Sequence, residues 1–283
     1  MARQILPVVI TILLCACDGA TIKSGTPGQN AATRFLTGDE SSGYARVLMN
    51  RPFDFPRDHA SHPEYRSEWW YFTGNLDSDD GDHFGFELTF FRFALAPNII
   101  ERESAWGTNQ AWMAHMSLMD KAGNLFVATE RFSREALGLA GSKLAPFSLR
   151  LEDWSAESDG SELFPLRLRA NDPVGAIDLN LFPLKGPVAQ GDEGFDRKGP
   201  EEGNASHYYS YTRLRTEGTI RVGDREALVT GLSWMDREWG TSALNADLAG
   251  WDWFSLQLAD GRDVMYYRLR TNDGATSPFS SGS

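Results

Sequence analysis

The residues best suited to chemistry in this 283-residue chain lie in one stretch, Leu232 to Trp253. That stretch holds four of the nine tryptophans, together with four acidic side chains. Burying an aromatic side chain is favourable, whereas burying an unpaired carboxylate is costly. A stretch rich in both is either an aromatic surface patch or the wall of an apolar pocket with a few polar groups. We favour the pocket wall.

The spacing of the acidic residues in this stretch suggests acid catalysis. On a strand, Trp234, Asp236 and Glu238 would share one face, and Arg237 would point to the other. Two carboxyl groups this close, in apolar surroundings, disfavour joint ionisation, so one pKa should rise. A carboxyl group that keeps its proton near neutral pH can act as a general acid. In the structural alternative, both carboxylates form ion pairs with arginines: Arg213, Arg215 or Arg237.

Other side chains could complete such a site. His115 lies within a predicted strand, where it would either orient water or a ligand or pack as a hydrogen-bonded core histidine. Glu68 and Trp70 share a face of an earlier strand, where they would line the cavity or lock that strand in place. Tyr208, Tyr209 and Tyr211 alternate, so at least one set should face the interior. The candidate ligand-contacting residues are Glu68, Trp70, Tyr209, Trp234, Trp251 and Trp253.

Several classes of site lack their residues in the sequence. The two cysteines, Cys15 and Cys17, lie near the start, which excludes an internal disulfide framework, a thiolate zinc site and a cysteine nucleophile. No pair of histidines has metal-ligand spacing. The chain contains no Gly-x-Ser-x-Gly elbow, phosphate loop or His-Glu-x-x-His motif. We therefore expect a site that needs neither a metal nor a cofactor.

The composition describes an acidic globular protein. The formal net charge is −12, so the chain should repel nucleic acid and anionic membrane surfaces. No basic patch with interleaved aromatic residues is present, and we expect no nucleic-acid partner. The length suffices for one large domain or two smaller ones.

The elements that would position these residues are antiparallel strands. From about residue 66 the chain consists of short alternating runs separated by turn residues, a pattern typical of an all-β sandwich or barrel. One short piece, Ser133 to Ala140, could be helical. Two long loops, Ala96 to Gln110 and Gly186 to Ser206, would rim a binding mouth, although the second could equally be a disordered excursion. Five hairpins are predicted, from Glu68–Leu76 with Phe84–Leu95, Trp112–Met119 with Leu125–Phe132, Phe147–Trp154 with Leu163–Ala170, Tyr208–Val222 with Ala227–Met235, and Trp253–Leu258 with Val264–Arg270, and Ala176–Leu184 is a further strand.

The N-terminus reads as a targeting segment. Arg3 precedes an apolar run, Ile5 to Leu14, that is too short to span a bilayer securely. Leu14-Cys-Ala-Cys17 resembles a bacterial lipobox, which implies cleavage before Cys17 and lipid attachment to its thiol. A plain secretory signal is the alternative. Asp18 resembles an inner-membrane retention signal, which implies a periplasmic location on a membrane tether, and residues 18–43 read as a flexible spacer.

Five motifs in order carry a family resemblance. They are Ser67-Glu-Trp-Trp-Tyr-Phe-Thr-Gly74, Ala114-His-Met-Ser-Leu-Met-Asp120, Tyr208-Tyr-Ser-Tyr-Thr-Arg213, Trp234-Met-Asp-Arg-Glu-Trp-Gly240 and Gly250-Trp-Asp-Trp-Phe-Ser-Leu-Gln-Leu258. Together they resemble the lipocalin-like family of AttH-type secreted proteins and carotenoid 1,2-hydratases. The resemblance implies two tandem lipocalin-like β domains, here residues 44–245 and 246–283. The second would be incomplete, because relatives continue for most of another domain.

The resemblance also suggests a function. In the hydratase branch a buried Asp has the position of Asp236, which would protonate a terminal alkene while Trp70, Trp234 or Trp251 stabilise the cation. Glu238 or a tyrosine would orient the water. We expect a tethered periplasmic protein that binds a hydrophobic small molecule, an isoprenoid or a lipid. The alternatives are a hydratase-like lyase, or cyclase-type enzyme, and a non-catalytic accessory protein of an envelope transport system.

Overall fold

The computed structural model describes residues 42–98, 103–242 and 247–283. The described chain is built almost entirely from antiparallel strands in two sheets, and the one helical element is a short 3-10 turn, η1 (Arg57–His59). The predicted all-β, lipocalin-like architecture is confirmed. The predicted targeting segment, including Cys17, and most of the predicted spacer lie outside the described residues.

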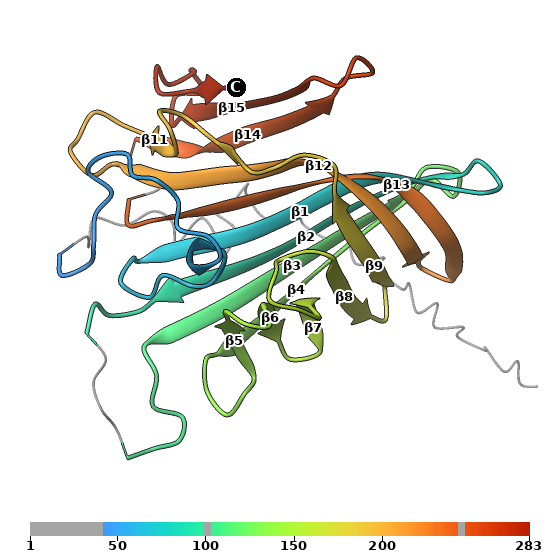
Figure 1. Cartoon of the computed structure of the whole chain (residues 1–283), viewed down its shortest axis with the longest axis horizontal. Coiled ribbons are helices and arrows are strands. Elements are labelled where there is room, and N and C mark those ends of the chain that lie inside the picture. Colours follow the sequence, from blue (N-terminus) through green and yellow to red (C-terminus); the bar gives the residue numbers. More distant parts are fainter. Residues whose placement is uncertain (1–41, 99–102, 243–246) are drawn as a thin grey trace, which may run out of the picture.

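The first sheet has 13 strands and curls into a nearly closed barrel. Along the sheet the order is β4-β3-β2-β1-β13-β12-β9-β8-β7-β6-β5, with β10 and β11 also paired to β12. The long strands run side by side across the molecule, and β5 to β9 lie on one side of them (Figure 1). The strands are β1 (Ser67–Ser78), β2 (His83–Ala94), β3 (Gln110–Asp120), β4 (Leu125–Arg134), β5 (Ala140–Lys143), β6 (Ser148–Leu151), β7 (Trp154–Ser158), β8 (Leu166–Asp172), β9 (Gly175–Pro183), β10 (Val188–Ala189), β11 (Phe195–Arg197), β12 (Ala205–Val222) and β13 (Arg225–Gly240).

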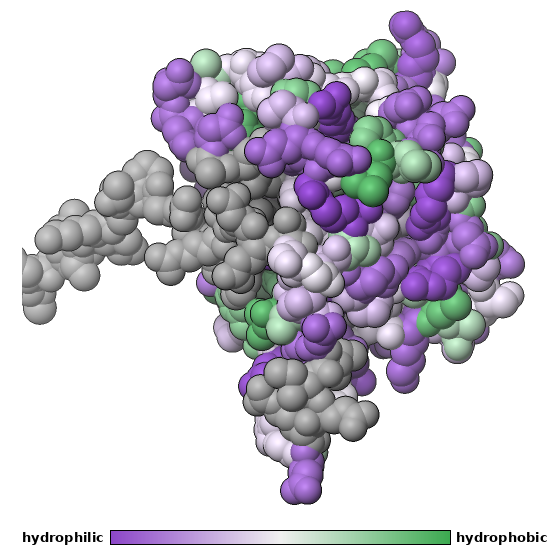
Figure 2. Space-filling model, turned by 90° about the vertical axis from the view of Figure 1, so that its left-hand side faces the viewer, coloured by the Kyte–Doolittle hydropathy of each residue, from purple (hydrophilic) through white to green (hydrophobic). Residues whose placement is uncertain are grey.

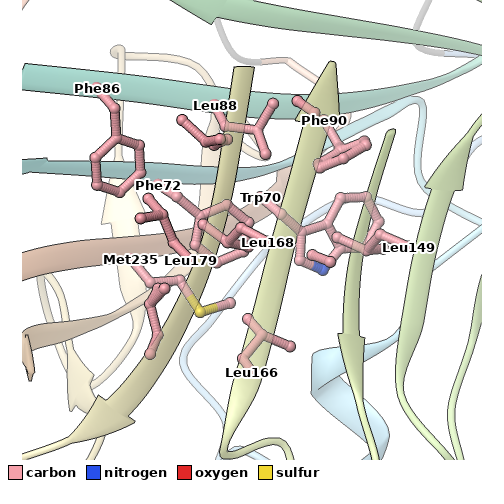
Figure 3. Packing of buried hydrophobic residues seen from close by; sticks show 14 of the residues in the cluster. Trp70, Phe72, Phe86, Leu88, Phe90, Leu149, Leu166, Leu168, Leu179 and Met235 are labelled. Carbon is pink, nitrogen blue, oxygen red and sulfur yellow. The ribbon is translucent and has the colours of Figure 1, made fainter. Parts of the chain in front are cut away.

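The curl of this sheet encloses the main hydrophobic core. Side chains from β1, β2 and β13 point toward side chains from β6, β8 and β9, so the inner face is filled rather than hollow (Figure 3). Trp70 and Trp112 stack at 5.6 Å between ring centroids, and both are fully buried. Alternation along strands such as β1, β8 and β9 sends every second side chain into this core.

The second sheet covers part of the outer face of the first sheet. It has three strands in the order β14-β15-β16, from β14 (Leu248–Gln257), β15 (Asp263–Thr271) and β16 (Ser281–Gly282). It lies beside β11 and β12, away from β5 to β9 (Figure 1). A second apolar cluster, with Phe91, Met113, Trp234, Leu248 and Tyr267 among its members, joins the two sheets.

Three sequence expectations needed correction. The predicted strand Phe147–Trp154 is interrupted by a turn at Glu152, whose backbone is in the left-handed region (φ 57°). The chain therefore forms a short hairpin of β6 and β7 there. Ser133 to Ala140 forms no helix, since its start ends β4 and its last residue begins β5. The stretch from Gly186 to Ser206 is no disordered excursion, because β10 and β11 pair with β12. The other predicted hairpins are present.

The surface of the protein is largely hydrophilic on the face that Figure 2 shows. Apolar side chains form small, separate patches on that face. Within the described ranges, no helix has the length and apolar character needed to cross a membrane.

Candidate functional site

Strand β13 divides its side chains between the two faces as alternation predicts. Arg237 and Trp239 point into the closed core of the first sheet. Trp234, Asp236 and Glu238 point to the outer face, toward the second sheet and the segment around β11. The predicted set thus shares one face, but that face looks away from the barrel interior.

Asp236 is buried in a ring of hydrogen-bond donors. The Tyr208 hydroxyl donates to its Oδ2 at 2.8 Å, while the Ser210 hydroxyl (2.5 Å) and the Trp234 indole N–H (2.6 Å) donate to Oδ1. Only 4% of the Asp236 surface is accessible. All three donors are uncharged, so none of them supplies the positive charge that would compensate a buried carboxylate.

This environment raises the pKa of Asp236 toward neutral pH. Burial raises the pKa of Asp236 to about 7, although the hydrogen bonds from Ser210, Trp234 and Tyr208 oppose the shift. Hydroxyl groups can donate or accept a hydrogen bond, so Ser210 and Tyr208 can serve either protonation state. A carboxyl group with a pKa near the working pH is suited to general acid catalysis.

A groove of about 630 Å³ lies between β1, β13 and β14. The Asp236 carboxyl is not part of its wall, but Trp234, which donates a hydrogen bond to Asp236, is. The size of the groove is that of a small-molecule pocket. Trp253 packs edge-on against Tyr71 at 5.1 Å and against Trp234 at 5.9 Å, so these three aromatic rings form one end of the groove. The polar side chains in the wall come mainly from β1 and β14: Thr73, Asn75, Asp77, Ser255 and Gln257.

Glu238 has a different environment from Asp236. The Lys198 ammonium lies 3.1 Å from its Oε1, and the Ser206 hydroxyl donates to the same oxygen at 2.5 Å. Burial raises the pKa of Glu238, and the charge of Lys198 opposes that shift. Glu238 thus has a cationic partner, whereas Asp236, the carboxyl group predicted to act with it, has none.

Three predicted ligand contacts lie on the opposite face of the first sheet from Asp236. Trp70 and Tyr209 are fully buried in the core of the first sheet, on the opposite side from Asp236. Glu68, also fully buried, pairs with the guanidinium groups of Arg92 and Arg237. Burial alone would raise the pKa of Glu68, but these two charges outweigh it and hold the pKa well below its usual range. These residues stabilise the interior and take no part in the groove.

His115 and Trp251 lie at a distance from the Asp236 carboxyl. His115 and Asp236 lie in the same row of cross-strand neighbours, with Tyr71 and Thr89 between them. Three strand spacings, roughly 14 Å, therefore separate His115 from Asp236. Burial lowers the pKa of His115, with Glu130 opposing the shift. Trp251 is 37% exposed and is not part of the groove wall, whereas Trp253 is.

Sequence reasoning missed several residues of the site. It selected Tyr209 rather than Tyr208. Alternation shows that these two side chains point to opposite faces of the strand, but it does not show which face carries the site. Tyr71 belongs to the motif from Ser67 to Gly74, but nothing in the sequence indicated that it lies in the site. Glu87 was overlooked: it lies on the outer face with Thr89 and Ser117, and burial raises its pKa to about 7 against the hydrogen bonds from those hydroxyls. Its cross-strand partner, Thr73, lines the groove.

Metal ligation finds no support in the described ranges. No group of three His, Cys, Asp or Glu side chains there is placed to hold a metal ion.

Comparisons with known proteins place this arrangement in a family. The family model described as AttH-like matches residues 46–283. A crystal structure from Nitrosomonas europaea described as AttH is 33% identical, with a TM-score of 0.71, covering 82% of this chain and 69% of that one. Kievitone hydratase from Nectria haematococca is similar in fold (TM-score 0.59, 14% identity, 88% and 72% covered), as is CghA with Sch210972 (0.52, 12%, 88% and 65%). No curated protein matched. The chain therefore belongs to the AttH-like family.

Proposed function

We propose that this protein binds a hydrophobic small molecule, of the isoprenoid or lipid class, in the groove between its two sheets. The observation that carries the proposal is the end wall of Tyr71, Trp234 and Trp253 beside the buried carboxyl of Asp236. Aromatic rings offer a large apolar surface, and the polar side chains farther along the groove would orient one end of the ligand.

Native mass spectrometry of the full chain tests this proposal. We expect an organic molecule to remain bound, and we expect Trp253→Ala to lose it. A wild-type protein that carries no such molecule and binds no uncharged hydrophobic probe, such as N-phenyl-1-naphthylamine, would rule the proposal out.

A second candidate function is acid-catalysed hydration of an alkene, and the raised pKa of Asp236 favours it. Asp236 would give its proton to one alkene carbon, and the faces of Tyr71, Trp234 and Trp253 would stabilise the resulting cation. Water would then form the new C–O bond and release a proton that restores Asp236. Two solved structures of similar fold are a hydratase and a protein described with a small molecule.

Asp236→Asn distinguishes the two candidates. If the protein is an enzyme, an acyclic isoprenoid incubated in ¹⁸O-labelled water yields a labelled alcohol with the wild type and none with Asp236→Asn, although the ligand still binds. If the wild type retains lipid but never forms alcohol, the binding function stands alone.

We further propose that a lipid on Cys17 tethers the protein to the periplasmic side of the inner membrane, where an envelope transporter could be a partner. The sequence around Cys17 supports this proposal. Labelled palmitate should enter the wild type but not Cys17→Ser, and an unmodified Cys17 in the mature protein would exclude the tether.

A further inference from the structure

Next to the Asp236 site lies a second buried group of charged side chains. The Lys198 ammonium donates to Asp196 Oδ2 at 2.5 Å and lies 3.1 Å from Glu238 Oε1. The Tyr267 hydroxyl donates to the other oxygen of Asp196 at 2.8 Å. Lys198, Asp196 and Glu238 are each at most 7% exposed, so water screens their charges little.

The two groups are connected through Tyr208. Its hydroxyl donates to Asp236, while its ring lies 5.4 Å from the Lys198 ammonium. The Trp253 indole N–H donates to the same hydroxyl at 3.2 Å, so Tyr208 also contacts a wall of the groove. Asp236 and Glu238 are two residues apart on the same face of β13, within reach of each other's charge.

The carboxyl groups in this buried region outnumber the cations. Three carboxyl groups, from Asp196, Glu238 and Asp236, share this buried region with one ammonium group. Asp196 and Glu238 contact Lys198 directly, and a third negative charge on Asp236 would have no partner. A buried, unpaired charge is costly, so the proton belongs on Asp236.

We propose that Lys198 is a positioning residue for this site: by fixing the charges of Asp196 and Glu238, it determines that Asp236 is the carboxyl group that holds the proton. The inference rests on the proposed role of the groove and names the group that would prepare its acid. Burial alone would lower the pKa of Lys198, but the carboxylates of Asp196 and Glu238 outweigh it and raise that pKa above its usual range. Lys198 therefore stays charged.

Each segment contributes a part of this arrangement. Asp196 and Lys198 come from β11 and the residue after it, in the stretch from Gly186 to Ser206, whereas Tyr267 comes from β15 of the second sheet. The titratable groups around Asp236 and Lys198 are Tyr71, Asp196, Tyr208, Glu238 and Tyr267. In ordinary surroundings the carboxyl groups among these titrate at about pH 4 and the tyrosine hydroxyls at about pH 10, so burial has to raise the pKa of a carboxyl group before it can hold a proton near neutral pH.

Carboxyl-carbon NMR titration of the full chain tests the proposal without any ligand. In the wild type we expect Asp236 to have the highest titration midpoint of the three, near pH 7. Lys198→Met should leave at least two of the three protonated, whereas Lys198→Arg, which keeps the charge, should behave like the wild type. Lys185→Met is the matched control, because Lys185 pairs with Asp263 outside this group.

Asp196→Asn provides a second test in case Lys198→Met does not fold. Removing one carboxylate leaves Lys198 balanced by Glu238 alone, so the titration midpoint of Asp236 should fall by about half a unit or more. An unmoved Asp236 midpoint in Asp196→Asn, or unchanged protonation in a folded Lys198→Met protein, would overturn the proposal. If these shifts occur but N-phenyl-1-naphthylamine does not bind, the proposed function fails and the role of Lys198 stands.

Discussion

The carboxyl group of Asp236 and the guanidinium group of Arg237 are neighbours in sequence but lie on opposite faces of β13. Arg237 pairs with Glu68 inside the first sheet, while Asp236 accepts hydrogen bonds from uncharged donors on the outer face. An ion pair between the two, which the sequence alone allowed, is therefore absent. The alternation of the strand therefore places a charged, paired side chain and a carboxyl group without a cationic partner side by side in sequence.

Replacing Asp236 with Asn should stabilise the protein at alkaline pH. The folded state holds the proton up to about pH 7, whereas the ordinary pKa of the group is 3.8. The stability that the protonated form contributes is complete below pH 3.8 and is lost as pH rises through 7. Asp236→Asn cannot ionise, so its advantage should grow to as much as about 4 kcal/mol well above pH 7. Urea unfolding across the pH range measures it, and an advantage that does not change with pH would contradict the assignment.

Replacing Trp234 with Ala should weaken binding of N-phenyl-1-naphthylamine by roughly tenfold or more, because the ring forms a wall of the groove. Trp106→Ala is the matched control, since Trp106 is 51% exposed in a loop away from the groove. Fluorescence titration gives both dissociation constants. Equal losses in the two variants would show that the probe binds elsewhere.

Replacing Trp70 with Ala should lower the stability of the protein and leave probe binding unchanged. The side chain is fully buried in the main core, so its loss should cost about 3–5 kcal/mol of the free energy of unfolding. The protein that remains folded should bind the probe with wild-type affinity. If the variant binds the probe more weakly but is as stable as the wild type, Trp70 contacts the ligand and the prediction is wrong.

Replacing Glu68 with Gln should also destabilise the protein. The change leaves Arg92 and Arg237 buried without their carboxylate, at a cost of about 3–5 kcal/mol. Glu217→Gln is the control, because the Arg215–Glu217 pair is largely exposed and should contribute less than about 1 kcal/mol. Chemical denaturation of both variants makes the comparison, and similar losses would argue against a structural role for Glu68.

Local pattern predicted the strands and the grouping of side chains, but not their absolute orientation. Alternation correctly placed Trp234 with Asp236, and it correctly separated both from Arg237. It could not show whether this set faces the core, because that depends on how the whole sheet curls. Trp70 and Tyr209 were therefore grouped with Asp236 although they lie in the main core. Lys198 was missed because it is far from Glu238 in sequence.

The filled interior and the groove on the outer face have a consequence for the family's diversification. Selection for a new ligand can act on Tyr71, Thr73 or Trp234 while Trp70, Phe72 and Met235 continue to hold the fold, because successive residues belong to different environments. Along these strands, side chains that fill the main core thus alternate with side chains that line the groove. A barrel that housed its ligand in its centre would have to change its core and its ligand contacts at once.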